Sequence, residues 1–157
     1  MSQRILIAGL GNIFLGDDGF GVEVVRRLST QGLSASVRVA DFGIRALHLA
    51  YELLDGSYEI TILVDAARMG DEPGTVYFIK PDIDTLLGDT SELPDAHAMD
   101  FRSVLHLLRS LGGKPGDLYV VGCEPLQLED EIGLSKPVAA AVEEALRLIH
   151  ERLADWE

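Results

Sequence analysis

GLGNIFLGDDGFG, residues 9–21, follows the apolar run RILIA and precedes VEVVRRL, whose apolar spacing is typical of a helix. A glycine-rich turn between a buried strand and a helix is the arrangement in which many α/β proteins bind the phosphates of a dinucleotide. The same stretch contains two adjacent carboxylates, Asp17 and Asp18. The loop could therefore bind a phosphate, or its carboxylates could have a function of their own.

The spacing of the glycines argues against a phosphate-binding loop. A dinucleotide fingerprint requires glycine at its first, third and sixth positions. Gly9 and Gly11 fit this pattern, whereas the sixth position is Phe14. No Lys-Ser or Lys-Thr pair follows, as a Walker loop would require, and the stretch contains no cation. Because the two carboxylates would repel a phosphate, we expect them to cap the helix or to face a cation.

The composition predicts one domain that spans residues 1–157. Of the 157 residues, 47% are apolar, which is enough for a hydrophobic core. No apolar run approaches the roughly 20 residues of a membrane helix, and the start MSQRILIAGLGN lacks the order of a signal peptide. The single cysteine, Cys123, lies in an apolar strand, is expected in the core, and excludes both a disulfide framework and a cysteine-cluster metal site. We therefore expect a cytoplasmic protein.

The net charge of −13 narrows the class of partner. A strongly acidic chain is repelled by nucleic acids and by anionic membranes, so we expect neither as a partner. A metal ion, a basic peptide, or a merely well-solvated surface is compatible with this charge. We expect the chain to be a monomer.

Five apolar segments have the pattern of strands: RILIAGLG from Arg4, VRVADFG from Val37, YEITILVDAA from Tyr58, TVYFIKP from Thr75 and DLYVVGCEP from Asp117. Several are almost continuously apolar, which is typical of strands buried on both faces. Helical patterns at residues 19–31, 44–54 and 99–112 separate them, and a last helix begins at Ser135 as its N-cap.

This order predicts a three-layer α/β/α sandwich with a mixed, mostly parallel five-stranded sheet. The short connection GDEPG favours a hairpin, so the fourth strand is expected to run antiparallel to the third. The longest irregular stretch runs from Asp82 to Ala98, and long loops in compact domains are often functional. In the helix at 44–54, the helical period places on one apolar face Leu47, Ala50, Tyr51 and Leu54.

Polar side chains follow the strands at their carboxyl ends, which is where open α/β sheets bind ligands. A carboxylate that ends an apolar strand is desolvated unless it is paired or binds a cation, which makes Asp65 the most informative of them. The full set consists of Asn12, Asp17 and Asp18 after the first strand, Asp41 at the end of the second, Asp65 at the end of the third, Glu124 after the fifth, and His97 in the long loop.

Each of these residues also has a structural interpretation. Asp65 would cap a neighbouring helix, and one of the pair Asp17 and Asp18 would cap the first helix while the other faces the site. Asp41 would end its strand in a turn. His97 is the only histidine outside a predicted helix, and a lone loop histidine is commonly a surface residue.

Asp18, Asp65 and His97 form a candidate set of two carboxylates and one imidazole. Three mixed oxygen and nitrogen ligands with open positions suit an exchangeable or catalytic divalent ion better than a structural one. The set has no local signature such as HExxH, so spacing alone does not establish it.

Several motifs occur in the order in which one known family has them. They are GLGNIFLGDDGFGVEVV, the strand-end aspartate of ILVDA, the GTV strand after a short turn, the loop His97, and GCEPLQLEDEIGLSKPV. The sequence thereby resembles the hydrogenase maturation endopeptidases, the proteases that process the large subunit of nickel–iron hydrogenases. The resemblance extends over nearly the whole chain.

The resemblance implies a phosphorylase/hydrolase-like fold and an endopeptidase that removes a short C-terminal extension from the large-subunit precursor after nickel insertion. By position, the family's metal-contacting residues fall on Asp18, Asp65 and His97. The metal implied is nickel supplied by the substrate, for which zinc- or cadmium-like ions substitute in crystals. Asp41 falls where the family has an aspartate linked to activity, which makes Asp18, Asp65 and Asp41 the expected catalytic residues.

Two positions depart from the family pattern. The first-loop ligand is glutamate in some members, whereas Asp18 is shorter by one methylene. The second-strand motif is often Asp-Gly-Gly-Thr, but here it is DFGI.

Two mechanisms and two rival functions remain open from the sequence. A metal ion would polarise the scissile carbonyl or lower the pKa of a bound water; alternatively, Asp18 and Asp65 would activate water as a metal-free carboxylate pair. No GxSxG elbow or cysteine triad is present. The rival functions are a non-catalytic nickel-docking module that uses the same ligands and a flavodoxin-like cofactor binder.

Overall fold

The structure is a computed structural model, and it describes residues 3–84 and 101–156. All the predicted strands are present within a few residues of their expected bounds. Along the chain the elements are β1 (Ile5–Leu10), the 3-10 helix η1 (Gly16–Gly19), α1 (Phe20–Leu28), β2 (Val37–Gly43), α2 (Ala46–Asp55), β3 (Ile60–Ala66), β4 (Val76–Ile79), α4 (Phe101–Ser110), β5 (Asp117–Cys123) and α5 (Lys136–Trp156).

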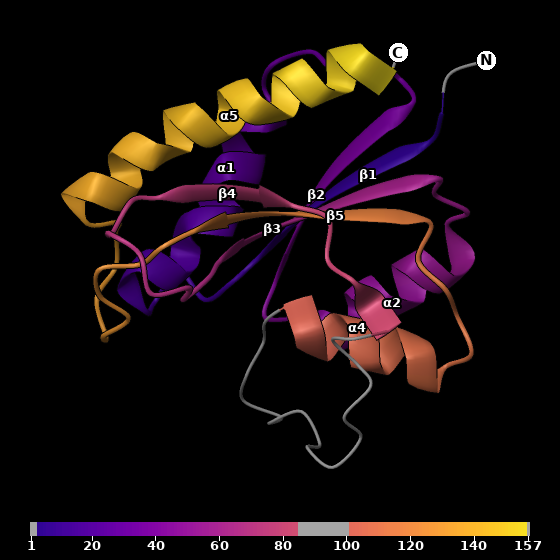
Figure 1. Cartoon of the computed structure of the whole chain (residues 1–157), viewed down its shortest axis with the longest axis horizontal. Helices are drawn as coiled ribbons and strands as arrows, with labels where there is room; N and C mark the ends of the chain where they lie inside the picture. Colours follow the sequence, from indigo (N-terminus) through magenta and orange to yellow (C-terminus); the bar gives the residue numbers. More distant parts are fainter. Residues whose placement is uncertain (1–2, 85–100, 157) are drawn as a thin grey trace.

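The strands form one five-stranded sheet in the order β2-β1-β3-β5-β4. β1, β2, β3 and β5 are parallel, and β4 is antiparallel to β5. Helices α1 and α5 cover one face of the sheet, and α2 and α4 cover the other (Figure 1). The predicted three-layer sandwich with a mixed sheet and an antiparallel fourth strand is therefore confirmed.

The predicted hairpin between the third and fourth strands is wrong, because β5 lies between them. β5 pairs with β3 along seven residues, whereas β4 pairs with β5 along four, from Val76 to Ile79. β5 is largely buried and suits the interior of the sheet, while the half-buried β4 suits an edge. The connection crosses the end of β5, where backbone N–H groups of Ala67 and Gly74 donate to the carbonyls of Cys123 and Glu124 at 2.9 and 2.8 Å.

The predicted apolar face of α2 is not the buried one. Leu47, Tyr51 and Leu54 are exposed, and the residues that pack in the core are Ala46, Leu49, Ala50 and Leu53. The segment has apolar residues on two of its faces, so helical periodicity alone left two choices. For α5 the periodicity was unambiguous, and its predicted stripe from Val138 to Leu153 is buried.

The sheet separates two hydrophobic clusters. All six residues of β1 are buried, and their side chains alternate between a cluster under α1 and α5 and a cluster under α2 and α4. The carboxyl end of β1 is therefore held by packing on both faces of the sheet. No helix within residues 3–84 and 101–156 is long and apolar enough to cross a membrane.

Candidate active site

The carboxyl ends of β2, β1, β3 and β5 lie side by side at one edge of the sheet. The chain winds from β1 outward to β2 and returns to β3 on the other side of β1, so the strand order reverses between β1 and β3. Ligands bind at such a point in open α/β sheets. The prediction that the first and third strands are neighbours is confirmed, and it places the loop after β1 next to Asp65 at the end of β3.

The glycines of the first loop serve close packing. Gly11 has φ +132°, and a Cβ there would lie 1.9 Å from the carbonyl oxygen of Asp18. Gly21, in α1, lies so close to β3 that a Cβ would be 2.1 Å from the carbonyl oxygen of Val64. Only glycine allows η1 and α1 to approach the strand ends this closely. The glycines thus bring the carboxylates of the loop against the sheet.

Asp17 is fully buried and joins the first loop to the segment between β5 and α5. Its carboxylate accepts hydrogen bonds from the backbone N–H groups of Leu126, Gln127 and Ser135 at 2.8, 3.0 and 2.7 Å, and from the Ser135 hydroxyl at 2.8 Å. Burial alone would raise the pKa of Asp17, but these hydrogen bonds outweigh it and lower the pKa. Asp17 is therefore a charged structural clamp.

The alternative that one of the paired aspartates caps the first helix is wrong. The N-cap of α1 is Gly19, and no side chain caps it. Asp17 turns instead to the distant segment at Ser135, the residue just before α5. Asp18 is half-buried, and its Oδ2 accepts a hydrogen bond from the backbone N–H of Asn12 at 2.7 Å.

Asp65 is buried at the end of β3, with 1% of its surface exposed. The residue is not isolated, but its Oδ2 atom is buried and accepts no hydrogen bond from the described residues. The 3-10 helix η1, which contains Asp18, contacts β3. Asp18 and Asp65 thus come from adjacent elements at the same sheet edge.

Asp41 is exposed, and it ends β2 in a turn. Its Oδ1 accepts a hydrogen bond from the backbone N–H of Gly43 at 2.7 Å, and its carbonyl accepts one from the Arg45 side chain at 2.6 Å. The turn interpretation of Asp41 is thereby confirmed. Asp41 is paired with Gly9 of β1, so it lies at the sheet edge that carries the other carboxylates. A role of Asp41 in activity stays a prediction.

Glu124, directly after β5, is nearly buried and organises the connection between β3 and β4. It accepts hydrogen bonds from the backbone N–H groups of Met69 and Gly70 at 2.7 and 3.2 Å, and the hydroxyl of Tyr77 lies 2.9 Å from its Oε2. Burial would raise the pKa of Glu124, but the hydrogen bonds, first that of Met69, lower it. Burial, together with the carboxylates of Asp71 and Glu124, raises the pKa of Tyr77.

The metal set of Asp18, Asp65 and His97 stays a prediction, because His97 lies outside the described residues. Within residues 3–84 and 101–156, no three His, Cys, Asp or Glu side chains are close enough together to hold a metal ion. Cys123 is in the core as predicted, and burial raises the pKa of its thiol to about 12. It is therefore not a candidate nucleophile.

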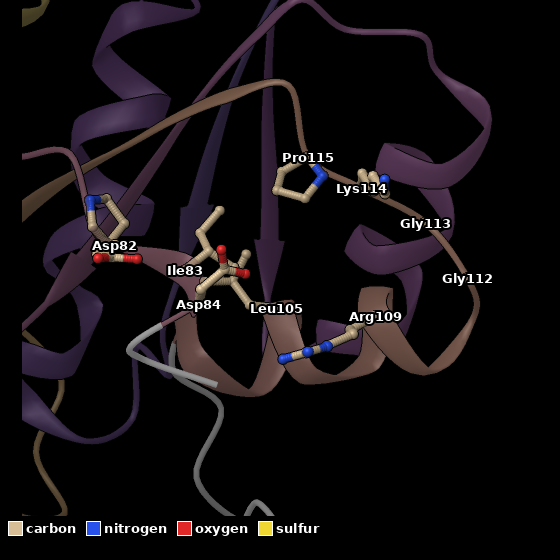
Figure 2. Close-up of a pocket in the computed structure, with 10 residues that line it drawn as sticks. Asp82, Ile83, Asp84, Leu105, Arg109, Gly112, Gly113, Lys114 and Pro115 are labelled. Atoms are coloured by element: carbon tan, nitrogen blue, oxygen red, sulfur yellow. The ribbon is translucent and has the colours of Figure 1, made fainter. Parts of the chain in front are cut away.

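A large cavity of about 650 Å³ lies away from these carboxylates. It is formed by the segment after β4, by α4 and by the residues from Gly112 to Pro115 that precede β5 (Figure 2). This position is at the amino end of β5, whereas Asp65 lies at the carboxyl end of the neighbouring strand. We place the candidate active site by the strand ends rather than by cavity size, because the polar groups converge there.

Comparison with known proteins gives the family of the chain. A family model described as hydrogenase maturation protease matches residues 22–152. The chain is 33% identical over 152 residues to the hydrogenase expression/formation protein HupD of Rhodobacter capsulatus, covering 92% of this chain and 70% of that protein.

Two solved structures are similar over almost their full length. The hydrogenase maturating endopeptidase HybD from E. coli has a TM-score of 0.78 and 31% identity, covering 97% of this chain and 93% of that one. A hydrogenase 2 maturation peptidase from a Thaumarchaeota archaeon has a TM-score of 0.73 and 34% identity, covering 97% and 99%. The chain belongs to the hydrogenase maturation protease family, and it is a hydrolase of the endopeptidase type with a role in hydrogenase maturation.

Proposed function

We propose that this protein removes the C-terminal extension of a nickel–iron hydrogenase large-subunit precursor after nickel insertion. The observation that carries the proposal is the position of Asp65, a carboxylate 1% exposed at the end of β3 and beside the loop of Asp18. Family membership gives the reaction class, and the strand-order reversal gives the place.

We propose further that Asp18, Asp65 and His97 dock the nickel that the precursor brings. The nickel is part of the substrate, and carboxylate oxygens and an imidazole are suitable ligands for a divalent ion. Asp65 lies at a buried strand end, where a cation brought by the substrate would be shielded from water and would interact more strongly with the carboxylate. Processing would then wait for nickel insertion, because an empty precursor lacks the group that these side chains recognise.

The chain's own side chains have separate tasks in this proposal. Asp65 and Asp18 hold the scissile peptide near the strand ends, while the Asp17 clamp keeps the first loop in place. A docked metal supplies polarisation of the scissile carbonyl or a more acidic water. Asp41, at the exposed rim, accepts a proton from the attacking water and passes it to the leaving amine as the peptide bond breaks. The alternative mechanism is a metal-free pair in which Asp18 and Asp65 activate the water themselves.

The decisive experiment is intact-mass analysis of nickel-loaded precursor incubated with and without this protein. We expect a mass loss equal to one C-terminal segment, and no loss with nickel-free precursor. If the loaded precursor binds but keeps its full mass, the protein is a docking module and the endopeptidase proposal is wrong. If nickel-free precursor is shortened equally well, the docking role of the three side chains is wrong.

His97 allows the ligand set to be tested separately. We expect His97→Ala to weaken capture of the loaded precursor while the protein stays folded, because loop residues rarely hold a core together. Far-ultraviolet circular dichroism and a pull-down measure the two properties. A variant that unfolds, or that captures and processes the precursor like wild type, would show that His97 is structural or incidental.

We also propose that the protein works as a monomer in the cytoplasm, without nucleic acid or membrane as a partner. The net charge of −13 supports this by disfavouring self-association and anionic partners. Light scattering at several protein concentrations tests the monomer, and a mass that rises with concentration would contradict it.

A further inference from the structure

A second cavity, of about 260 Å³, lies next to the candidate active site on the α2 and α4 side of the sheet. Its floor is formed by Val120 and Gly122 of β5 together with residues of β4, and the start of α4 covers it. The lining is mainly apolar, with Met69, Tyr77, Ile79 and Phe101 as its large uncharged side chains, and Asp82 and Arg102 are its charged residues.

The sheet register places this cavity beside Asp65. Asp65 is the cross-strand partner of Gly122, and Gly122 is the partner of Tyr77. The three residues therefore form one row on one face of the sheet, the same face as Leu63 and Val120. Because the middle residue has no side chain, Ala67 and Tyr77 approach Gly122 closely, at 3.1 and 3.5 Å from the position that a Cβ would take, and these three residues line the cavity.

The walls of the cavity are fixed by hydrogen bonds. The hydroxyl of Tyr77 lies 2.8 Å from Asp71 Oδ2 and 2.9 Å from Glu124 Oε2, and Glu124 also accepts the backbone N–H of Met69. Glu124 thus sets the position of two wall residues from one buried carboxylate. A cavity whose walls are held in this way is preorganised for its occupant.

The size and lining of the cavity define its occupant. A volume of about 260 Å³ is below the range of pockets that hold drug-sized ligands or cofactors, and it suits one side chain. An apolar lining favours an apolar side chain, because the transfer of apolar surface from water is the main gain on binding. A charged side chain would lose part of its hydration against this lining, in which Asp82 and Arg102 are the charged residues among those described.

We propose that this cavity is a specificity pocket for one apolar side chain that flanks the scissile bond of the precursor. The proposal rests on the proposed function, since the cavity acquires this meaning only if the bond is cut beside Asp65. Gly122 sets the depth of the pocket, Met69 and Tyr77 form its walls, and Glu124 is the positioning residue behind them.

Two variants change the pocket in opposite directions. Gly122→Ala adds a methyl group that would lie 3.1 Å from the Cβ of Ala67 and 3.5 Å from Cδ2 of Tyr77, so it fits after a small shift and fills the floor. Met69→Ala removes a wall side chain that is 53% exposed, so it enlarges the pocket without opening the core. Leu47→Ala, at a residue 46% exposed on α2, is the matched control for loss of an apolar surface group.

The substrates are nickel-loaded precursors in which the residue on either side of the scissile bond is replaced by Ala, Leu, Trp or Asp. Initial rates of shortening are measured by intact mass. We expect wild-type enzyme and Leu47→Ala to process the best apolar substrate at least about tenfold faster than the Asp substrate. We expect Gly122→Ala to shift the preference toward Ala and Met69→Ala to shift it toward Trp.

The outcomes separate the pocket from the function itself. If wild-type enzyme does not shorten the unaltered loaded precursor, the proposed function fails. If wild-type enzyme shortens it, but both pocket variants keep the wild-type order of substrates, the function stands and the pocket proposal is wrong. Met69→Ala alone decides the matter if Gly122→Ala does not fold, because an unchanged preference for side-chain size in that variant overturns the proposal.

Discussion

Asp17 and Asp65 are both buried carboxylates at the carboxyl edge of the sheet, yet their surroundings differ. Asp17 receives hydrogen bonds from three backbone N–H groups and one hydroxyl, which hold the first loop against the segment before α5. Asp65 ends the central strand β3, and its Oδ2 atom receives no hydrogen bond from the described residues. Burial therefore does not identify a functional carboxylate. The donors around Asp17 identify it as a structural clamp, whereas Asp65 is distinguished by its place at the end of β3 beside the loop of Asp18.

The largest effect is expected from Asp65→Asn, which keeps the size of the side chain and removes its charge. We expect precursor capture to be lost and cleavage to fall by about 10² or more, because the variant lacks a ligand or base. The free energy of unfolding should stay the same or rise, because Asn keeps the size of the side chain and removes a charge that burial disfavours. A pull-down, intact mass and urea unfolding measure the three properties.

A different pattern would favour the metal-free pair. If Asp65→Asn retains loaded precursor as well as wild type but cannot shorten it, only the chemical step is lost. The docking role of Asp65 would then be wrong, and water activation by Asp18 and Asp65 would replace it.

Asp17→Ala should have the opposite profile, with its main effect on stability. Removing the carboxylate leaves the N–H groups of Leu126, Gln127 and Ser135 buried without their acceptor. At about 1 kcal/mol or more for each of the three unsatisfied groups, we expect a loss of at least about 3 kcal/mol in the free energy of unfolding. Urea unfolding monitored by circular dichroism gives this number.

Asp130→Ala is the matched control, because Asp130 is an exposed acidic residue in the segment between β5 and α5 that Asp17 contacts. We expect its effect on stability to stay within about 0.5 kcal/mol. If Asp17→Ala were equally harmless, the hydrogen bonds of Asp17 would not be the connection between the two loops.

The contrast between these two aspartates also marks what the sequence could predict. The strand-loop-helix pattern around residues 9–21 and the apolar runs determined the layers, and the strand-end rule placed Asp65 correctly. The hairpin was wrong because chain proximity says nothing about a strand that inserts later, as β5 does between β3 and β4. The face of α2 was wrong because two apolar faces compete in one helix.

The roles of the acidic residues were harder to predict, since their partners are distant in the chain. Asp17 contacts Ser135 across 118 positions, and Glu124 contacts Met69 across 55. No local motif encodes such contacts, so Asp17 and Asp18 were equivalent in the sequence. The pocket above Gly122 likewise depends on the register of three strands, which no single segment contains.

Acid should weaken the hydrogen bonds that the buried carboxylates of Asp17 and Glu124 accept. The pKa values of Asp17 and Glu124 are lowered in the folded protein from ordinary values of 3.8 and 4.5. Each carboxylate therefore contributes stability that is fully present above its unfolded pKa and is lost as pH falls through its folded pKa. We expect the urea midpoint to fall as pH drops below about 4.5, and Glu124→Gln to show a smaller fall. A variant with the full wild-type dependence would contradict a role for Glu124.

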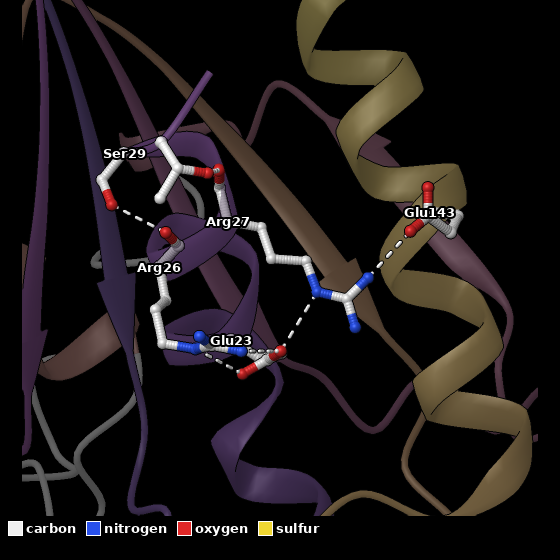
Figure 3. Close-up of polar contacts among 6 residues, drawn as sticks. Glu23, Arg26, Arg27, Ser29 and Glu143 are labelled. Atoms are coloured by element: carbon white, nitrogen blue, oxygen red, sulfur yellow. Dashed lines mark hydrogen bonds and ion pairs between the residues drawn. The ribbon is translucent and has the colours of Figure 1, made fainter. Parts of the chain in front are cut away.

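The smallest effect is expected from Glu143→Gln, which tests the exposed counterpart of these buried carboxylates. Figure 3 shows Arg27 between Glu23, which like Arg27 belongs to α1, and Glu143 of α5. Arg27 Nη1 lies 2.8 Å from Glu143 Oε1. The Glu143 side chain is 75% exposed, so water competes with the guanidinium and salt screens the pair. Removing one negative charge also relieves repulsion in a chain of net charge −13. We therefore expect the free energy of unfolding to change by less than about 0.5 kcal/mol, and by less still at high salt. A loss above about 1 kcal/mol in urea unfolding would mean that Arg27 stabilises an exposed carboxylate about as well as one of the buried N–H groups around Asp17 stabilises a buried one, and the difference between exposed and buried carboxylates would not hold.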